Sequence, residues 1–320
     1  MQCNSRVEHL NYMVPLRSDA RNPKNFLLYK PLMEADLYEN FPAAKLLLPK
    51  PLKKPVALIY HVVRTLAEIT DDGDWSAAER HVRLADFRAG LDAVAAGRSA
   101  PVHPTLFATL ADTVRRHGLP LEPFYQLMSA FEQDVETTRY ATRATLLDYC
   151  SRSATPIGKL MLHLIGAATP ENLADSDSIC TGLQLVALLR DIPSDWARGR
   201  VYLPLADRQR FGVAEAQIAG GIVDDGWRAL MQHEIAQARA MIVRGAPLGL
   251  RVPGRCGLEL CSVVHGGLRV LERIEHADYD VFYHRPALRV ADRAIVLLRT
   301  AAMWLSRRVG VGMPSVEGNA

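Results

Sequence analysis

The stretch that decides the fold runs from residue 184 to residue 204 and reads QLVALLRDIPSDWARGRVYLP. Asp191 and Asp195 are four residues apart, which places them about 40° apart around a helix and roughly 6 Å apart along it. The residues before them are apolar on nearly all sides, so we expect this helix to be buried. A buried pair of carboxylates needs a divalent cation or a cationic partner. A charged, solvated helix face is the alternative interpretation.

Pro193 lies between the two aspartates. Proline has no backbone N–H, and its ring presses on the carbonyl group of the residue four positions earlier, here Leu189. We therefore predict a kink that re-aims Asp195. Arg190, Arg198 and Arg200 surround the pair, and Arg190 and Arg200 offer cationic groups to an anionic ligand.

A second acidic cluster ends another apolar helix, which we predict over residues 56–70. Glu68 and Asp71 are three residues apart, and Arg64 precedes Glu68 by four, so the three side chains share one helix face. The cluster is a candidate metal site that faces the first aspartate pair across one cavity. An ordinary ion pair at a negatively charged helix end is the alternative.

A further apolar helix is predicted over residues 146–166, and small residues interrupt its surface at Ser153, Ala154 and Gly158. Small side chains permit two helices to approach closely, or they leave a slot for a long ligand. Both interpretations stay open. The segment 245–257 is predicted to be a loop, and the last helices are predicted over residues 258–274 and 287–305.

Several of these segments, in this order, resemble motifs of the squalene/phytoene synthase family, and most closely those of its bacterial hydroxysqualene synthase branch. The resemblance runs from about Leu37 to Trp304 and includes YENFP at 38–42 and GGLRVLERIE at 266–275. It implies an all-α fold, a single large helical domain of the trans-isoprenyl diphosphate synthase (terpenoid synthase) type with a central cavity. No segment alternates with the period of a β-strand, which agrees with this fold class.

The resemblance also implies roles for individual residues. The expected catalytic residues are Arg64, Asp71, Tyr149, Gln184, Arg190, Asp191, Asp195, Arg200 and Tyr202. Expected ligands of Mg²⁺ are Glu68, Asp71, Asp191 and Asp195, and expected substrate contacts are Phe41, Ser153, Ile157, Gly158 and Leu183. Tyr149 becomes a candidate for a polar or cation-facing role inside an apolar cavity.

Three positions depart from the family pattern. Leu37 replaces a histidine that helps to hold a diphosphate, Ala67 replaces an aspartate of the first acidic motif, and Ala187 replaces an asparagine of the second. Each change removes a polar ligand. The expected metal site therefore has fewer protein ligands than the family pattern provides.

The function implied by the resemblance is the Mg²⁺-assisted ionisation of presqualene diphosphate, after which water captures the carbocation to give hydroxysqualene. Such a site must neutralise the charge of the diphosphate and keep water away until it is needed. Two alternatives stay open. One is a non-catalytic family member that binds a prenyl ligand or a partner synthase, and the other is a head-to-head prenyltransferase of the phytoene synthase type.

The composition suits one helical domain, because 320 residues of which 49% are hydrophobic can bury a large core. We expect an N-terminal extension at 1–36, the helical domain at 37–305 and a C-terminal tail at 306–320. The net charge of +3 is too small an excess of basic residues to bind a polyanion, so nucleic acid is not an expected partner.

The five cysteines contain no CxxC pair and indicate reduced thiols. No signal peptide and no apolar run of about eighteen residues is recognisable, so we expect a cytoplasmic protein. Peripheral contact with the inner face of the membrane, and association with other enzymes of the squalene pathway, stay open.

Overall fold

The computed structural model describes residues 49–71, 74–283 and 285–309. Within these ranges the chain forms helices and no β-strand, and the single isolated bridge joins Arg139 and Val201. The all-α prediction is confirmed. Expectations for the extension 1–36, for Leu37 and for Phe41 lie outside the described residues.

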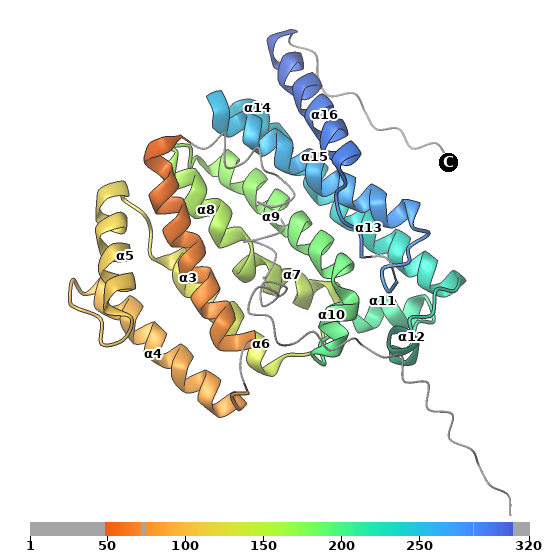
Figure 1. The fold of residues 1–320 in the computed structure, drawn as a ribbon, viewed down its shortest axis with the longest axis horizontal. Coiled ribbons are helices and arrows are strands. Elements are labelled where there is room, and N and C mark those ends of the chain that lie inside the picture. Colours follow the sequence, from red (N-terminus) through yellow and green to blue (C-terminus); the bar gives the residue numbers. More distant parts are fainter. Residues whose placement is uncertain (1–48, 72–73, 284, 310–320) are drawn as a thin grey trace, which may run out of the picture.

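The helices are joined by short connections (Figure 1). In chain order they are η1 (Lys50–Leu52), α3 (Lys53–Asp71), α4 (Ala77–Ala95), α5 (Pro104–His117), α6 (Glu122–Glu136), α7 (Arg143–Ser153), α8 (Thr155–Leu164), α9 (Pro170–Arg190), α10 (Ile192–Ala197), α11 (Leu205–Arg210), α12 (Glu215–Gly220), α13 (Asp225–Gly245), α14 (Pro247–Arg251), α15 (Gly254–His276) and α16 (Val290–Val309). None of the described helices is both long and apolar enough to cross a bilayer.

Helix α9 is the central element, because it packs against α7, α8, α13, α14 and α15 (Figure 1). Leu185, Val186 and Leu189 are buried on it, as the apolar run in the sequence predicts. Gly182 brings α13 close, since a Cβ atom at this position would lie 2.6 Å from Cγ1 of Ile242. Helix α9 therefore carries its polar residues deep into the molecule.

Two apolar clusters lie on either side of this centre. One joins α3, α4, α5, α6 and α8 through side chains such as Leu66, Phe87 and Phe124. The other joins α7, α9, α13 and α15 through side chains such as Trp227 and Leu271. The cavities described below are lined from both clusters.

Some predicted boundaries were wrong for identifiable reasons. The helix predicted over 146–166 is two helices, because the backbone changes direction at Ala154 (φ −115°). Pro156 has no backbone N–H and so cannot continue the hydrogen bonds of the first helix. The segment predicted as a loop at 245–257 contains α14 and the start of α15. Helix α16 continues to Val309, so the predicted boundary of the tail at 306 falls inside a helix.

Candidate active site

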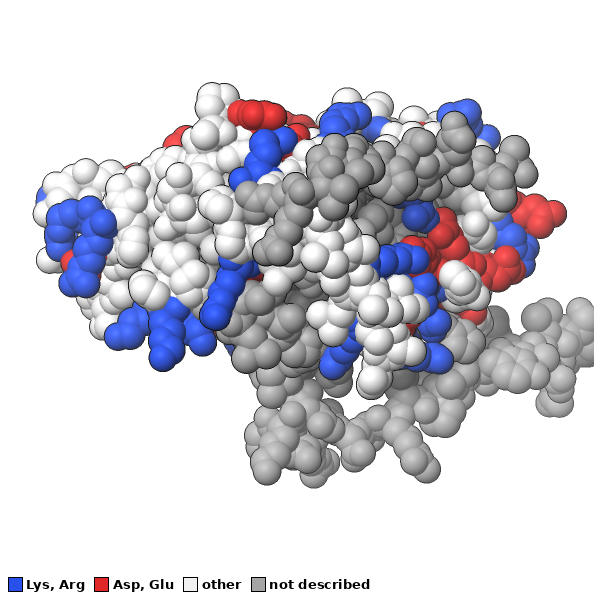
Figure 2. Space-filling model, turned by 90° about the horizontal axis from the view of Figure 1, so that it is seen from above, with Lys and Arg blue, Asp and Glu red and all other residues white. Residues whose placement is uncertain are grey.

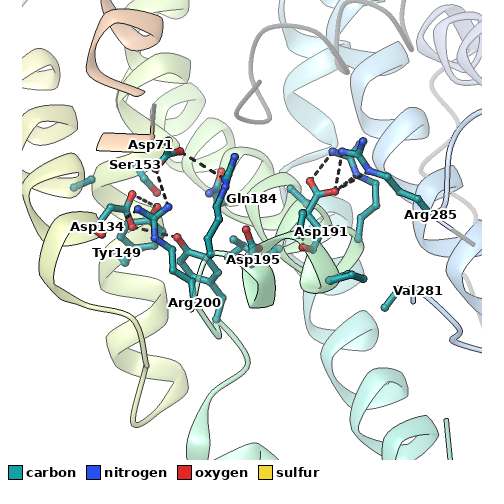
Figure 3. Close-up of a pocket in the computed structure, with 18 of the residues that line it drawn as sticks. Asp71, Asp134, Tyr149, Ser153, Gln184, Asp191, Asp195, Arg200, Val281 and Arg285 are labelled. Atoms are coloured by element: carbon teal, nitrogen blue, oxygen red, sulfur yellow. Dashed lines mark hydrogen bonds and ion pairs between the residues drawn. The ribbon is translucent and has the colours of Figure 1, made fainter. Parts of the chain in front are cut away.

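A polar cavity of about 250 Å³ lies where the C-terminal ends of α3, α6 and α9 meet α10 (Figure 3). Its charged lining consists of four carboxylates and four guanidinium groups: Asp71, Asp134, Asp191, Asp195, Arg190, Arg198, Arg200 and Arg285. The formal charges of this lining balance when all eight groups are ionised. The cavity therefore holds many charges without a large net charge of its own.

Asp191 occupies the break that Pro193 imposes, as predicted. Helix α9 ends at Arg190 and α10 begins at Ile192, with Asp191 between them at φ −100° and ψ 12°. The backbone N–H of Asp195 still donates to the carbonyl oxygen of Asp191 at 2.9 Å. The two aspartates thus stay one turn apart although they no longer share a regular helix.

Two arginines neutralise the carboxylate of Asp191. Arg190 donates from Nε and Nη2 at 3.2 and 2.8 Å, and Arg285 donates to Oδ1 at 3.1 and 2.9 Å (Figure 3). Arg285 comes from the segment between α15 and α16, so this contact joins distant parts of the chain. Charge-assisted hydrogen bonds of this kind are among the stronger ones in proteins.

Asp71 faces the same cavity from the end of α3. Arg200 donates to its Oδ1 at 2.9 Å, and Arg198 lies 3.7 Å from its Oδ2. Glu68, an expected ligand of Mg²⁺, is not among the residues that line this cavity. Val63 and Asp71 line it from α3, whereas Glu68 is 46% exposed and pairs with Arg64 at 2.5 Å.

Neither Arg64 nor Glu68 belongs to the described lining of the cavity. Their contact is the ordinary i,i+4 ion pair that the sequence left open as an alternative. Tyr149, Gln184, Arg190, Arg200 and Tyr202 do line it, together with the aspartates at 71, 191 and 195.

Asp134 is buried beside two tyrosines. Tyr149 donates to its Oδ2 at 2.7 Å and Tyr202 to its Oδ1 at 3.2 Å, while Arg200 donates to its backbone carbonyl at 3.1 Å. Burial raises the pKa of Asp134 to about 6, against the lowering effect of Arg200 and the tyrosine hydroxyls. The hydrogen bonds to Asp134 hold the hydroxyl groups of Tyr149 and Tyr202 in place, and the two rings stack with centroids 5.7 Å apart.

Asp195 accepts no comparable side-chain hydrogen bond from the described residues. Burial, followed by the nearby charge of Asp191, raises the pKa of Asp195 to about 7, although Arg198 and Arg200 act in the opposite direction. A carboxylate that is costly to ionise beside another carboxylate is the arrangement that a cation relieves.

A second, apolar cavity of about 180 Å³ adjoins the first between α3, α8, α9 and α15. Gln184 lines both cavities. The expected substrate contacts Ile157, Gly158 and Leu183 line the apolar cavity, and Ser153 lines the polar one. Oγ of Ser153 is buried and has no hydrogen-bond partner among the described residues, which leaves it available to a ligand.

Gly158 is compatible with both interpretations that the sequence left open. A Cβ atom there would lie 2.3 Å from Oγ of Ser176 and 2.7 Å from Sγ of Cys180, so the glycine permits α8 and α9 to pack closely. It also lines the apolar cavity.

Glu259 introduces a carboxyl group into the apolar cavity. No hydrogen bond or ion pair joins it to another residue in the described ranges, and burial raises its pKa to about 7. The group is therefore neutral below that pH and charged above it.

We expect the affinity for farnesol, a prenyl chain without diphosphate, to fall as the pH rises from about 6 to about 8. A ligand that fills the cavity removes water from Glu259 and so favours the neutral carboxyl group. The loss approaches tenfold per pH unit, or about 1.4 kcal/mol, if binding requires the neutral form. Titration calorimetry at both pH values measures it.

The variant Glu259→Gln should bind farnesol equally at both pH values. Glu136→Gln changes a carboxylate that is 71% exposed outside the cavity, and it should keep the pH dependence of the parent. Equal affinity of the parent at both pH values would contradict this account of Glu259.

Whether the polar cavity suits Mg²⁺ depends on Asp191 and Asp195. In the described part of the chain, no three or more acidic, histidine or cysteine side chains form a ready-made metal site. Mg²⁺ in phosphate-binding sites is, however, commonly held by one or two carboxylates with substrate phosphates and water completing the shell. Asp195, whose pKa stays raised beside Asp191, fits an ion that enters together with a diphosphate.

Comparison with known proteins shows the family of the chain. The model of the squalene/phytoene synthase family matches residues 36–292. The chain belongs to the squalene/phytoene synthase family. A curated relative in this family, the phytoene synthase of Thermus thermophilus, is 31% identical over 258 residues, which are 80% of this chain and 86% of the relative.

Solved structures of squalene/phytoene synthases share the fold. Squalene synthase HpnC from Alicyclobacillus acidocaldarius is 32% identical, with a TM-score of 0.70 over 76% of this chain and 90% of that chain. A dehydrosqualene synthase in complex with ligand has a TM-score of 0.74 over 84% of this chain and 92% of its own, at 21% identity. The latter supports the fold alone.

Two charged residues of this squalene/phytoene synthase site were not predicted. Asp134 follows Leu127 and Ala130 at helical spacing on a buried face, and a carboxylate there was a recognisable signal of a buried polar contact. Arg285 lies in an irregular segment where no periodicity marks its direction. Only the folded chain brings it to Asp191.

Proposed function

We propose that the chain is an isoprenoid enzyme that ionises presqualene diphosphate with the help of Mg²⁺ and lets water capture the cation, giving hydroxysqualene. The observation that carries the proposal is that Gln184 lines a charged cavity and an apolar cavity at once. A prenyl diphosphate has the same two parts. The 32% identity to squalene synthase HpnC supports this branch of the family.

The arginines of the polar cavity supply the contacts for the phosphate oxygens. Arg190, Arg200 and Arg285 exchange their carboxylate partners for phosphate, which frees the carboxylates. Mg²⁺ held by Asp71, Asp191 and Asp195 would act as a Lewis acid on the leaving group.

The remaining lining protects the cation. The faces of Tyr149 and Tyr202 carry the negative side of the ring quadrupole, and their hydroxyls are held by Asp134. The apolar cavity excludes water from the chain of the substrate, so the cation survives until water is admitted.

Incubation of the purified chain with presqualene diphosphate and Mg²⁺ tests the proposal. Hydroxysqualene is the expected product. Tight binding of the substrate without turnover would favour the non-catalytic alternative. Formation of phytoene from geranylgeranyl diphosphate, but no product from presqualene diphosphate, would favour the reaction named for the curated relatives.

We expect Mg²⁺ and diphosphate to bind as a coupled pair. Asp71 and Asp191 are already paired with arginines, so Mg²⁺ alone must break ion pairs, whereas diphosphate releases them. Each ligand should raise the affinity for the other by about 5- to 150-fold. Calorimetric titration of Mg²⁺ with and without inorganic diphosphate measures the coupling. Tight Mg²⁺ binding by the ligand-free chain would contradict it.

Restoring the missing ligands should raise turnover or lower the Mg²⁺ requirement. Ala67 and Ala187 are 4% and 1% exposed, and Ala187 lines the polar cavity one turn before Asp191. The double variant Ala67→Asp/Ala187→Asn adds oxygen ligands beside those that remain. Ala108→Asp, at an exposed position on α5, is the matched control. An unchanged Mg²⁺ dependence of turnover would contradict the expectation.

A further inference from the structure

Helix α7 presents two hydroxyl groups to the polar cavity, from Tyr149 and from Ser153. The two residues are four positions apart, so they share one face of the helix, with Cβ atoms about 5–6 Å apart. Figure 3 shows both side chains on the same side of the cavity as Asp134. The two hydroxyl groups therefore face the same part of the cavity.

The hydroxyl group of Ser153 differs from those of its neighbours. Ser151 and Thr155 donate to the backbone carbonyl groups of Asp148 and Ser151, at 2.6 and 2.7 Å. Oγ of Ser153 is buried, yet nothing in the part of the chain that the structure describes forms a hydrogen bond with it. Because buried hydroxyl groups usually have a protein or water partner, this oxygen is suited to hold a water molecule in the cavity.

The hydroxyl group of Tyr149 is connected to a proton acceptor. It donates to Oδ2 of Asp134 at 2.7 Å, whereas the bond from Tyr202 to Oδ1 is longer, at 3.2 Å. Acidic groups on the surface, such as those gathered mainly at one end of the face in Figure 2, exchange protons with bulk water. Asp134 is buried, and burial raises its pKa to about 6. Its carboxylate is thus ionised at neutral pH and still able to accept a proton.

Capture of a carbocation by water releases a proton. The lone pair of the water oxygen forms the new C–O bond, and the first product is a protonated alcohol. Tyr149, Tyr202 and Asp134 are buried at this wall of the cavity, so bulk water has little access to it. Unless a nearby group accepts the proton, the protonated alcohol loses water again and returns to the cation.

We propose that Ser153 and Tyr149 hold the water molecule that captures the cation, and that Asp134 accepts the proton of this water through the hydroxyl group of Tyr149. The inference rests on the proposed function, which supplies the cation. As the C–O bond forms, an O–H bond of the water breaks and its proton passes to Oη of Tyr149. The hydroxyl proton of Tyr149 passes to Oδ2 of Asp134, which returns it to solvent after the alcohol leaves. The diphosphate leaving group is the competing acceptor.

The ratio of hydroxysqualene formed to diphosphate released tests the inference, because it separates capture by water from ionisation. The full chain and its variants react with presqualene diphosphate and Mg²⁺ in single turnovers. Asp134→Asn keeps an acceptor for the tyrosine hydroxyls but cannot take up the proton, so the ratio should fall at least about tenfold. Tyr149→Phe should have a similar effect. Ser153→Ala should also lower the ratio, since it removes one contact to the water.

Two control variants should keep the ratio of the parent. Ser151→Ala removes an exposed hydroxyl group from the same helix. Tyr125→Phe breaks a hydrogen bond from a tyrosine to Asp92 that is also 2.7 Å long but lies outside both cavities. Circular dichroism checks that each variant is folded.

Unchanged ratios in Asp134→Asn and Ser153→Ala would overturn the inference and assign the proton to the diphosphate. A parent that releases no diphosphate, or forms no alcohol, would instead refute the proposed function and the inference with it. If Asp134→Asn or Tyr149→Phe does not fold or does not ionise the substrate, Ser153→Ala decides, because it leaves the hydrogen bonds of Asp134 intact.

Discussion

Replacing Asp191 by alanine should lower turnover of presqualene diphosphate roughly a hundredfold or more, which corresponds to about 3 kcal/mol in the barrier. The substitution removes a carboxylate that two arginines hold at the break between α9 and α10. It also leaves Asp195 without the neighbour that shares a cation with it. Single-turnover rates at saturating Mg²⁺ measure the loss.

A matched control is Asp225→Ala, which removes a fully exposed carboxylate that pairs with Arg228 outside the cavity. Its turnover should equal that of the parent. If Asp191→Ala turns over as fast as the parent, the proposed role of Asp191 is refuted. Absence of turnover in the parent, with intact binding of the substrate, would instead support the non-catalytic alternative.

Replacing Arg200 by methionine should destabilise the fold by about 3 kcal/mol or more, because it breaks a buried charge pair and keeps only one partner. Arg200 is 12% exposed at its side chain and joins Asp71 of α3 to the backbone of Asp134 in α6. Urea denaturation measures the loss. Arg116→Met, at an exposed ion pair with Asp112, should cost less than about 0.5 kcal/mol.

The effect of Arg200→Met should depend on pH. The pKa of Asp134 is about 6, and Arg200 lowers it. Removal of Arg200 should therefore raise the pKa of Asp134 above this value. A carboxyl group with a raised pKa in the folded state destabilises the fold as the pH rises, because it ionises more easily in the unfolded chain. This loss of stability builds up between about pH 4, its unfolded pKa, and its folded pKa. The variant should therefore lose more stability at about pH 8 than at about pH 5. An equal loss at both pH values would assign the role of Arg200 to packing rather than charge.

The predictable part of the site is the part that is local in sequence. The apolar run before Asp191 predicted a buried helix, and Pro193 predicted the break, because both effects act within one or two turns. The sequence could not say whether Glu68 lines the cavity, because its three-residue spacing to Asp71 does not show which side of α3 faces inward. That direction is set by packing against α6 and α8.

Contacts between segments that are distant in the sequence could not be predicted from the sequence. Arg285 meets Asp191 across 94 positions of the chain, and Arg200 meets Asp71 across 129. Such pairs depend on how the helices stack, not on periodicity within one helix. Gly158 is an intermediate case. Its small size predicted that another group lies close to it, but not whether that group is a helix or a ligand.

The meeting of three helix C-termini at the polar cavity has its own electrostatic consequence. Asp71, Asp134 and Arg190 belong to the last turns of α3, α6 and α9. Each helix end carries a partial negative charge of about half an elementary charge from its unpaired carbonyl groups. The backbone thus favours positive charge at this point independently of the side chains. This contribution does not depend on the side chains at positions 67 and 187, so under the proposed function the peptide dipoles would stabilise an alkyl cation formed here.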